Sequence, residues 1–180
     1  MLDLYRKIIK TGAITLKTEK ITKLFQPEDV QIIGKKLNAH IKKLFGRSLA
    51  IRQVSAGSCN ACEIEINALA NAYYDMERFG ISIVASPRHA DALLVTGPVT
   101  RALKDAVLRT YEATPDPKIV IACGSCACDG GIYKGSYATL DGVDKVIPVD
   151  VYIRGCPPTP RAILAGILHA LESKNNQGTA

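Results

Sequence analysis

The spacing of apolar residues first predicts a helix over residues 27–46. Its apolar positions recur every three or four residues, so they fall on one helix face. These positions are Val30, Ile33, Leu37, Ile41 and Leu44. Glu28 and Asp29 stand in the first turn, lysines stand near the end, and Gly46 follows, which is the charge and glycine pattern of helix ends.

Beyond this helix, short apolar runs alternate with amphipathic segments. We expect strands over 49–54, 80–85, 91–97, 118–123 and 146–153. Because apolar strands that alternate with helices form parallel sheets covered on both faces, the pattern predicts an α/β fold. A flavodoxin-like arrangement is the default for such a chain, although the pattern leaves the strand order undetermined.

Three more helices complete the predicted frame, over residues 62–80, 99–113 and 158–173. The first would bury a face formed by Leu69, Tyr73 and Met76. The second would bury a stripe formed by Val99, Ala102, Leu103, Ala106, Val107 and Tyr111. We therefore expect a basic N-terminal arm and helix over 1–47, a flavodoxin-like domain over 48–172 and a flexible tail over 173–180.

Positive charge is concentrated at the start of the chain. Met1–Arg52 carries 12 Lys and Arg against 4 Asp and Glu, while the rest carries 11 against 13. Because the rest is nearly neutral and has no basic stripe with aromatic residues, we expect no nucleic-acid partner. The N-terminal arm is either a solvated helix face or a docking element for an acidic partner or an anionic lipid surface.

Six cysteines are best explained by metal or redox chemistry. No apolar run approaches the roughly 20 residues that span a bilayer. The first residues, MLDLYRKIIKTG, contain neither the apolar core of a secretory signal nor a twin-arginine pair. We therefore expect a protein of the reducing cytoplasm, where disulfides are rare.

Four of these cysteines directly follow predicted strands. Cys59 and Cys62 follow the strand over 49–54, Cys126 follows that over 118–123, and Cys156 follows that over 146–153. Because ligands of open α/β sheets collect at the carboxyl ends of the strands, these thiols should gather at one edge. Glycines in all three loops would let the backbone approach a bulky group closely.

Four thiolates can hold either zinc or an iron–sulfur cluster. Structural zinc sites usually combine two compact C-x-x-C knuckles, whereas this chain has one such motif and two isolated cysteines. A thioredoxin-type redox pair would leave Cys126 and Cys156 without a role. The spacing favours a cluster, and a zinc-stabilised α/β scaffold stays open as the alternative.

Four stretches resemble the small subunit of the membrane-bound, group 4 [NiFe] hydrogenases, which include formate hydrogenlyase. They are SAGSCNACEIEI, TGPVTRALKDAVLRTYEATPDPKIVIACGSCA, GGIY and VIPVDVYIRGCPPTP, and the resemblance covers residues 50–172. The relation extends to the 20 kDa subunit of respiratory complex I. The resemblance implies a flavodoxin-like fold and one [4Fe–4S] cluster bound by the matching residues Cys59, Cys62, Cys126 and Cys156.

The same resemblance implies the partners of the chain. The cluster would lie next to a large subunit that carries the nickel–iron centre, and electrons would pass to or from a ferredoxin-like iron–sulfur subunit. Membrane subunits would hold the complex on the cytoplasmic face of the cell membrane, with the N-terminal arm as the contact. The chain would thus be an electron-transfer subunit of an oxidoreductase that does not carry the catalytic centre.

The spacing of the cysteines in the first motif distinguishes the hydrogenase subunits from the complex I subunits. Complex I subunits carry adjacent cysteines at the first motif, whereas Asn60 and Ala61 stand between Cys59 and Cys62 here. The sequence therefore favours a hydrogenase over a complex I-like subunit with its cluster beside a quinone site. A chain of this type, without the signal and C-terminal extension of periplasmic hydrogenases, is expected to hold one cluster.

Several residues near these motifs have simpler explanations. Glu63 and Glu65 would stabilise the start of a helix, with proton transfer as a rarer role. Cys123 should fill the core at the end of its strand, and Cys128 is the main rival of Cys126 as a ligand. Among the histidines, only His89 is expected near a site edge.

Overall fold

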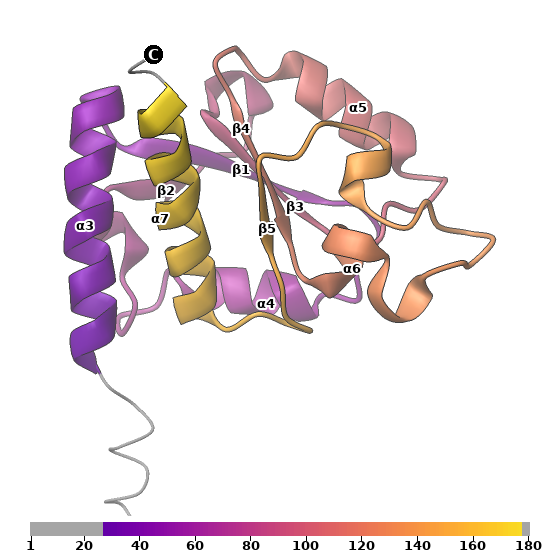
Figure 1. Cartoon of the computed structure of the whole chain (residues 1–180), viewed down its shortest axis with the longest axis horizontal. Helices are drawn as coiled ribbons and strands as arrows, with labels where there is room; N and C mark the ends of the chain where they lie inside the picture. The colour runs from indigo at the N-terminus through magenta and orange to yellow at the C-terminus, as the bar shows by residue number, and fades with distance from the viewer. Residues whose placement is uncertain (1–26, 178–180) are drawn as a thin grey trace, which may run out of the picture.

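The computed structural model describes residues 27–177, in which one parallel sheet is covered by helices on both faces (Figure 1). Its strands are β1 (Leu49–Ser55), β2 (Ile81–Ile83), β3 (Ala92–Thr96), β4 (Ile119–Cys123) and β5 (Val151–Ile153). All are parallel and lie in the order β2-β1-β3-β4-β5, which is the flavodoxin order. The predicted fold class is confirmed, while the expectations for the arm over 1–26 lie outside the described residues.

Two helical layers enclose the sheet. The helices are α3 (Pro27–Phe45), α4 (Ala61–Ala68), α5 (Lys104–Ala113), α6 (Ser125–Asp129) and α7 (Pro160–Gln177). On one face α3 and α7 lie side by side, with α4 below them, and their apolar residues share one core with the sheet (Figure 1). On the other face α5 and α6 close a second, smaller core.

The central strands explain why both layers are needed. Every residue of β3 and β4 is buried. Leu94 and Ile121 point into the core beneath α3 and α7, whereas Leu93 and Val120 point into the core beneath α5. Because successive side chains of a strand alternate between faces, an uninterrupted apolar run requires a cover on each side.

The prediction of one helix over 62–80 was wrong in length. α4 ends at Ala68, and a short 3₁₀ helix (Met76–Phe79) follows an irregular turn. The side-chain Oδ1 of Asn71 accepts hydrogen bonds from the backbone nitrogens of Tyr73 and Tyr74, at distances of 2.9 and 3.0 Å. This local bond competes with helical hydrogen bonding, so Tyr73 is exposed and does not join the expected buried face.

Three other elements are shorter than expected, and β2 covers only Ile81–Ile83 of the strand expected over 80–85. α5 begins only at Lys104, because Val99 has a φ of 49° and the backbone N–H of Thr100 donates to Ala56. Ala102 and Ala106 are consequently exposed, as is Leu44 near the end of α3. β5 covers only the last three residues of the expected strand, because the N–H groups of Val146 and Ile147 both donate to Val143 in a turn.

Close packing of α3 predicts the effect of a one-carbon substitution. A methyl group at Gly34 would overlap the ring of Phe79. Gly34→Ala should therefore lower the free energy of unfolding by about 1–3 kcal/mol, measured by urea denaturation, although alanine is the better helix former. Ala39→Ser, on the exposed side of the same helix, is the control and should change it by less than about 0.5 kcal/mol. Stabilisation by Gly34→Ala would contradict this packing.

Candidate metal centre

The four cysteines predicted to act together follow three different strands of the sheet. Cys59 lies in the loop after β1 and Cys62 in the first turn of α4. Cys126 lies in α6, directly after β4, and Cys156 lies in the loop after β5. Since these strands are parallel, all four residues stand at the carboxyl edge of the sheet.

Their thiols lie close enough to influence one another electrostatically. The pKa of Cys62 is raised to about 11, first by burial, then by Glu63 and by Cys126, Cys59 and Cys156. Burial also raises the pKa of Cys126, and Cys156 and Cys59 raise it further. A cation that binds these sulfurs must therefore displace protons from them, as metal binding to cysteine generally does.

The inner and outer thiols differ in exposure. Cys62 and Cys126 are half-buried, whereas Cys59 and Cys156 are exposed. Among residues 27–177, no three Cys, His, Asp or Glu side chains converge closely enough to hold a single metal ion. The four thiols influence one another electrostatically, and the side of the group formed by Cys59 and Cys156 is exposed to solvent.

Gly124 makes room for the inner thiol. Its φ of 94° favours glycine, and a methyl group there would stand 2.6 Å from the Sγ of Cys62. The loops of Cys126 and Cys156 meet beside it, because the backbone N–H and the hydroxyl of Ser125 both donate to the carbonyl of Gly155. These bonds fix two of the cysteine loops relative to each other.

A second tie between these loops is an exposed ion pair. Nη1 of Arg154 lies 2.9 Å from Oδ2 of Asp129, and this hydrogen bond lowers the pKa of the Asp129 carboxyl. The positive charge of Arg154 is therefore balanced locally. Burial raises the pKa of the Cys126 thiol, and the backbone N–H of Ile132 partly offsets this rise, which is the kind of contact that tunes a metal-bound sulfur.

Glu63 anchors the first cysteine loop. Its Oε1 accepts a hydrogen bond from the hydroxyl of Ser58. It accepts a second one, at 2.5 Å, from the hydroxyl of Thr96 at the end of β3. Burial raises the pKa of Glu63, but the hydrogen bonds from Ser58, Thr96 and Ser55 outweigh it and leave the pKa below its usual value. Its Oε2 is buried without a hydrogen-bond partner in the described part of the chain.

The hydroxyl contacts of Glu63 were not predicted from the sequence. The expected helix-start role is compatible with its place in the first turn of α4. Ser58 belongs to the small-residue loop before Cys59, but nothing in the local sequence links Thr96 to it. The sequence contains one hint of this contact, because the otherwise apolar strand β3 ends in the polar residue Thr96.

The two remaining cysteines are buried in the cores on either side of the sheet. Cys123 is fully buried in the core beneath α7, as predicted. Cys128 is buried in the other core, where its Sγ lies within 3.9 Å of the carbonyl of Ala122 and 3.7 Å of that of Ile153. Cys126, by contrast, is only half-buried.

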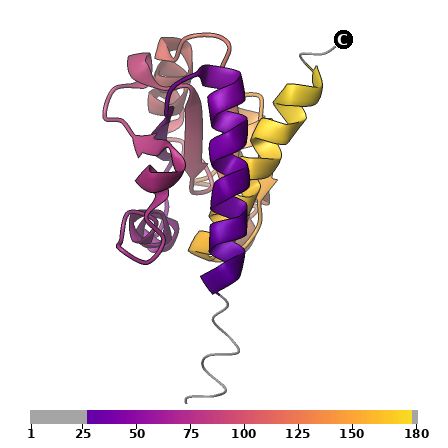
Figure 2. The same ribbon diagram turned by 90° about the vertical axis from the view of Figure 1, so that its left-hand side faces the viewer.

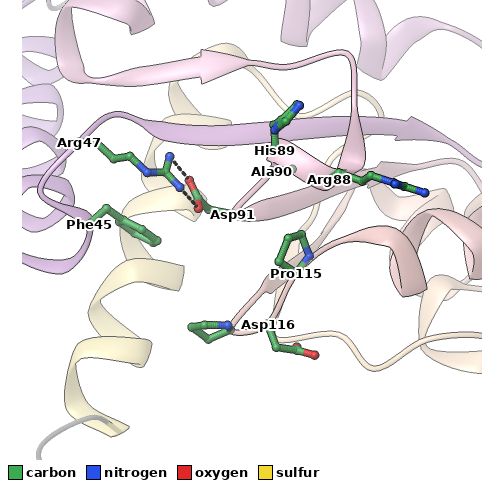
Figure 3. A pocket seen from close by; sticks show the side chains of 9 residues that line it. Phe45, Arg47, Arg88, His89, Ala90, Asp91, Pro115 and Asp116 are labelled. Carbon is green, nitrogen blue, oxygen red and sulfur yellow. Dashed lines mark hydrogen bonds and ion pairs between the residues drawn. The ribbon is translucent and has the colours of Figure 1, made fainter.

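A large pocket lies at the opposite edge of the sheet, away from the cysteines. It has a volume of about 500 Å³ and is lined by Phe45, Arg47, His89, Pro115 and neighbouring residues (Figure 3). A bidentate ion pair between the guanidinium of Arg47 and the carboxylate of Asp91, with N–O distances of 2.6 and 3.0 Å, forms one wall of the pocket. His89, the one histidine expected near a site edge, lines this pocket and not the edge that carries the cysteines.

Residues 59–170, which include all four cysteines, match the sequence family of the NADH ubiquinone oxidoreductase 20 kDa subunit. The match covers more than half of the chain. The chain belongs to this family.

Individual members of the family are similar over most of the chain. The probable membrane-bound hydrogenase subunit mbhJ of Pyrococcus furiosus is 53% identical over 134 residues, which cover 74% of this chain and 80% of that protein. An NADH-quinone oxidoreductase subunit of Desulfovibrio desulfuricans is 40% identical over 169 residues, which cover 94% of this chain and 90% of that protein. The predicted resemblance to subunits of oxidoreductase complexes is confirmed.

A third relative is much longer than the matching region. Formate hydrogenlyase subunit 7 of Escherichia coli is 51% identical over 135 residues, which cover 75% of this chain but 53%, about half, of that protein. Among solved structures, a chain of the membrane-bound sulfane sulfur reductase, an archaeal respiratory membrane complex, superposes with a TM-score of 0.64. It is 41% identical, and the match covers 84% of this chain and 77% of that one. No described helix of the present chain is long and apolar enough to cross a membrane.

The lowered pKa of Glu63 predicts a pH-dependent contribution to stability. Ionised Glu63 should stabilise the isolated chain above its unfolded-state pKa, about 4.3, and this contribution should disappear as the pH falls through the lower folded-state pKa. Glu63→Gln should thus have a lower free energy of unfolding than the natural chain at pH 7. The difference between the two free energies, measured by urea denaturation, should become smaller in strong acid. Glu65→Gln is the control on the same helix. A difference that is equally large at pH 7 and pH 3 would refute this role.

Proposed function

We propose that the chain holds one [4Fe–4S] cluster through Cys59, Cys62, Cys126 and Cys156. It would relay electrons to or from the nickel–iron centre of a partner large subunit in a membrane-bound hydrogenase complex. The observation that carries the proposal is the placement of four cysteines from three strand ends at one edge of the sheet, where Cys62 and Cys126 interact electrostatically with the other thiols. A cluster of this kind supplies one-electron transfer, which thiol chemistry alone does not.

The donor set suits an iron–sulfur cluster chemically. Cysteine thiolates are the soft ligands that bind such clusters, and all four candidates are free thiols. Gly124 leaves space against the inner sulfur of Cys62, and Ile132 offers a backbone hydrogen bond to Cys126. The chain's own residues thus provide the ligands, the space and one contact that adjusts a ligand's basicity.

The exposure of the outer thiols supports a partner at this edge. With Cys59 and Cys156 exposed, a group held by the four cysteines would face outward on one side. A large subunit that covers this side would exclude water and bring its own metal centre within electron-transfer range. A ferredoxin-like iron–sulfur subunit would then carry electrons onward, and membrane subunits would hold the assembly at the cytoplasmic face of the membrane.

A complex I-like role is the second candidate, because the NADH-quinone oxidoreductase subunit of Desulfovibrio desulfuricans matches 94% of the chain. The separation of Cys59 and Cys62 by two residues favours the hydrogenase role instead. Higher identity to the membrane-bound hydrogenase subunit, 53% against 40%, points the same way. The presence of nickel in the partner large subunit distinguishes the two roles.

Metal analysis tests the cluster against the zinc scaffold. The anaerobically purified complex should contain about four iron and four sulfide for each copy of this chain, beyond those assigned to other iron–sulfur subunits. The separated chain should retain iron and bind no stoichiometric nickel. A colourless chain with one bound zinc and no sulfide would establish the scaffold and exclude the electron-transfer role.

Single cysteine variants test the ligand assignment. Cys126→Ser should lose or convert the cluster, because serine replaces the thiolate at one corner. Cys128→Ala and Cys123→Ala should keep the iron content and the EPR signal, because both side chains lie in the core. Iron content and EPR spectra of the anaerobic complexes provide the measurement. An unchanged signal in Cys126→Ser, together with its loss in Cys128→Ala, would show that the neighbouring thiol is the ligand.

A further inference from the structure

The outer face of α3 is strongly basic. One side of α3 packs against α7 and the 3₁₀ helix through Val30, Gly34, Leu37 and Ile41. The opposite side faces away from the rest of the domain (Figure 2). Its exposed residues are Gln31, Ile32, Lys35, Lys36, Ala39, Lys42 and Lys43, which we call the α3 lysine face.

Within the described part of the chain, the charges of this face are not balanced by acidic neighbours. None of its lysines has an acidic group within 4.0 Å among the residues that the structure describes. Asp29, at the start of α3, is paired with Arg161 at 2.5 Å. By contrast, α5 mixes Lys104 and Arg109 with Asp105 and Glu112, so its surface carries both signs.

The lysines stand in two rows along an apolar line. Ile32 and Ala39 are seven residues apart, which is about two helical turns, so they lie on one line along the helix. Lys35 and Lys42 form a row on one side of that line, and Lys36 and Lys43 form a row on the other. Ile32 is 53% exposed although it is fully apolar.

We propose that the α3 lysine face lies on the anionic phospholipid surface of a membrane. Two basic rows around an apolar line match a plane of negative headgroups, because lysine side chains can extend to the headgroups while the apolar line approaches the acyl region. Each lysine close to such a surface contributes a factor of roughly five to the affinity. The proposal rests on the proposed function only in that both place the chain beside a membrane.

Vesicle binding tests this contact directly. The full chain would be floated with vesicles of phosphatidylcholine alone and with vesicles that contain an equal part of phosphatidylglycerol. Binding should require the anionic lipid and weaken with added salt. A variant with Lys35→Gln, Lys36→Gln, Lys42→Gln and Lys43→Gln should bind the anionic vesicles at least about tenfold more weakly.

A control of equal net charge separates this face from general basicity, to which the N-terminal arm contributes. Arg88→Gln, Lys104→Gln, Arg109→Gln and Lys145→Gln remove four exposed charges elsewhere and should weaken binding by less than about threefold. Ile32→Ser should reduce the binding that persists at high salt, whereas Ile83→Ser, at another exposed isoleucine that lies away from the cysteines, should not. Circular dichroism would confirm that each variant is folded.

Two results would overturn the proposal. The first is an equal loss of vesicle binding in the α3 variant and its control. The second is undiminished vesicle binding by the α3 variant. If that variant is also released from the purified complex, the face binds an acidic protein surface instead. The cluster's EPR signal should be the same in all variants, so failure here is distinguishable from failure of the proposed function.

Discussion

Parallel pairing of the strands determines where the chemistry of this chain can occur. Because β1, β4 and β5 run in the same direction, the loops that follow them emerge at one edge of the sheet. The segments that follow these strands carry Cys59 with Cys62, Cys126 and Cys156, and the three segments are far apart in sequence. Buried strands with two helical covers hold this edge in place, so the site depends on the same apolar packing that stabilises the fold.

Within that edge, short-range contacts refine the positions of the cysteine loops. Gly124 permits a close approach to Cys62, and Ser125 joins its loop to that of Cys156. Glu63 draws Ser58 and Thr96 together through two hydroxyl hydrogen bonds. A half-buried carboxylate that accepts such bonds ties the loop of Cys59 to the end of β3.

Much of this arrangement was predictable from the sequence, because apolar periodicity and strand-end cysteines are local signals. The α/β class and the gathering of the four cysteines at one edge required no long-range information. The early end of α4 was not predictable, since it depends on the side chain of Asn71 capping a turn. The contact between Glu63 and Thr96 joins residues 33 positions apart, and only the folded sheet brings them together.

The central claim is that a cluster held by this chain lies beside the nickel–iron centre of a partner subunit. The most direct measurement is EPR of the intact anaerobic complex, poised so that the nickel centre is paramagnetic and the cluster is either oxidised or reduced. The account predicts that the nickel signal splits or relaxes faster when the cluster is reduced, and that Cys126→Ser abolishes or alters this interaction. A nickel signal that ignores the redox state of the cluster, or a large subunit without nickel, would contradict it.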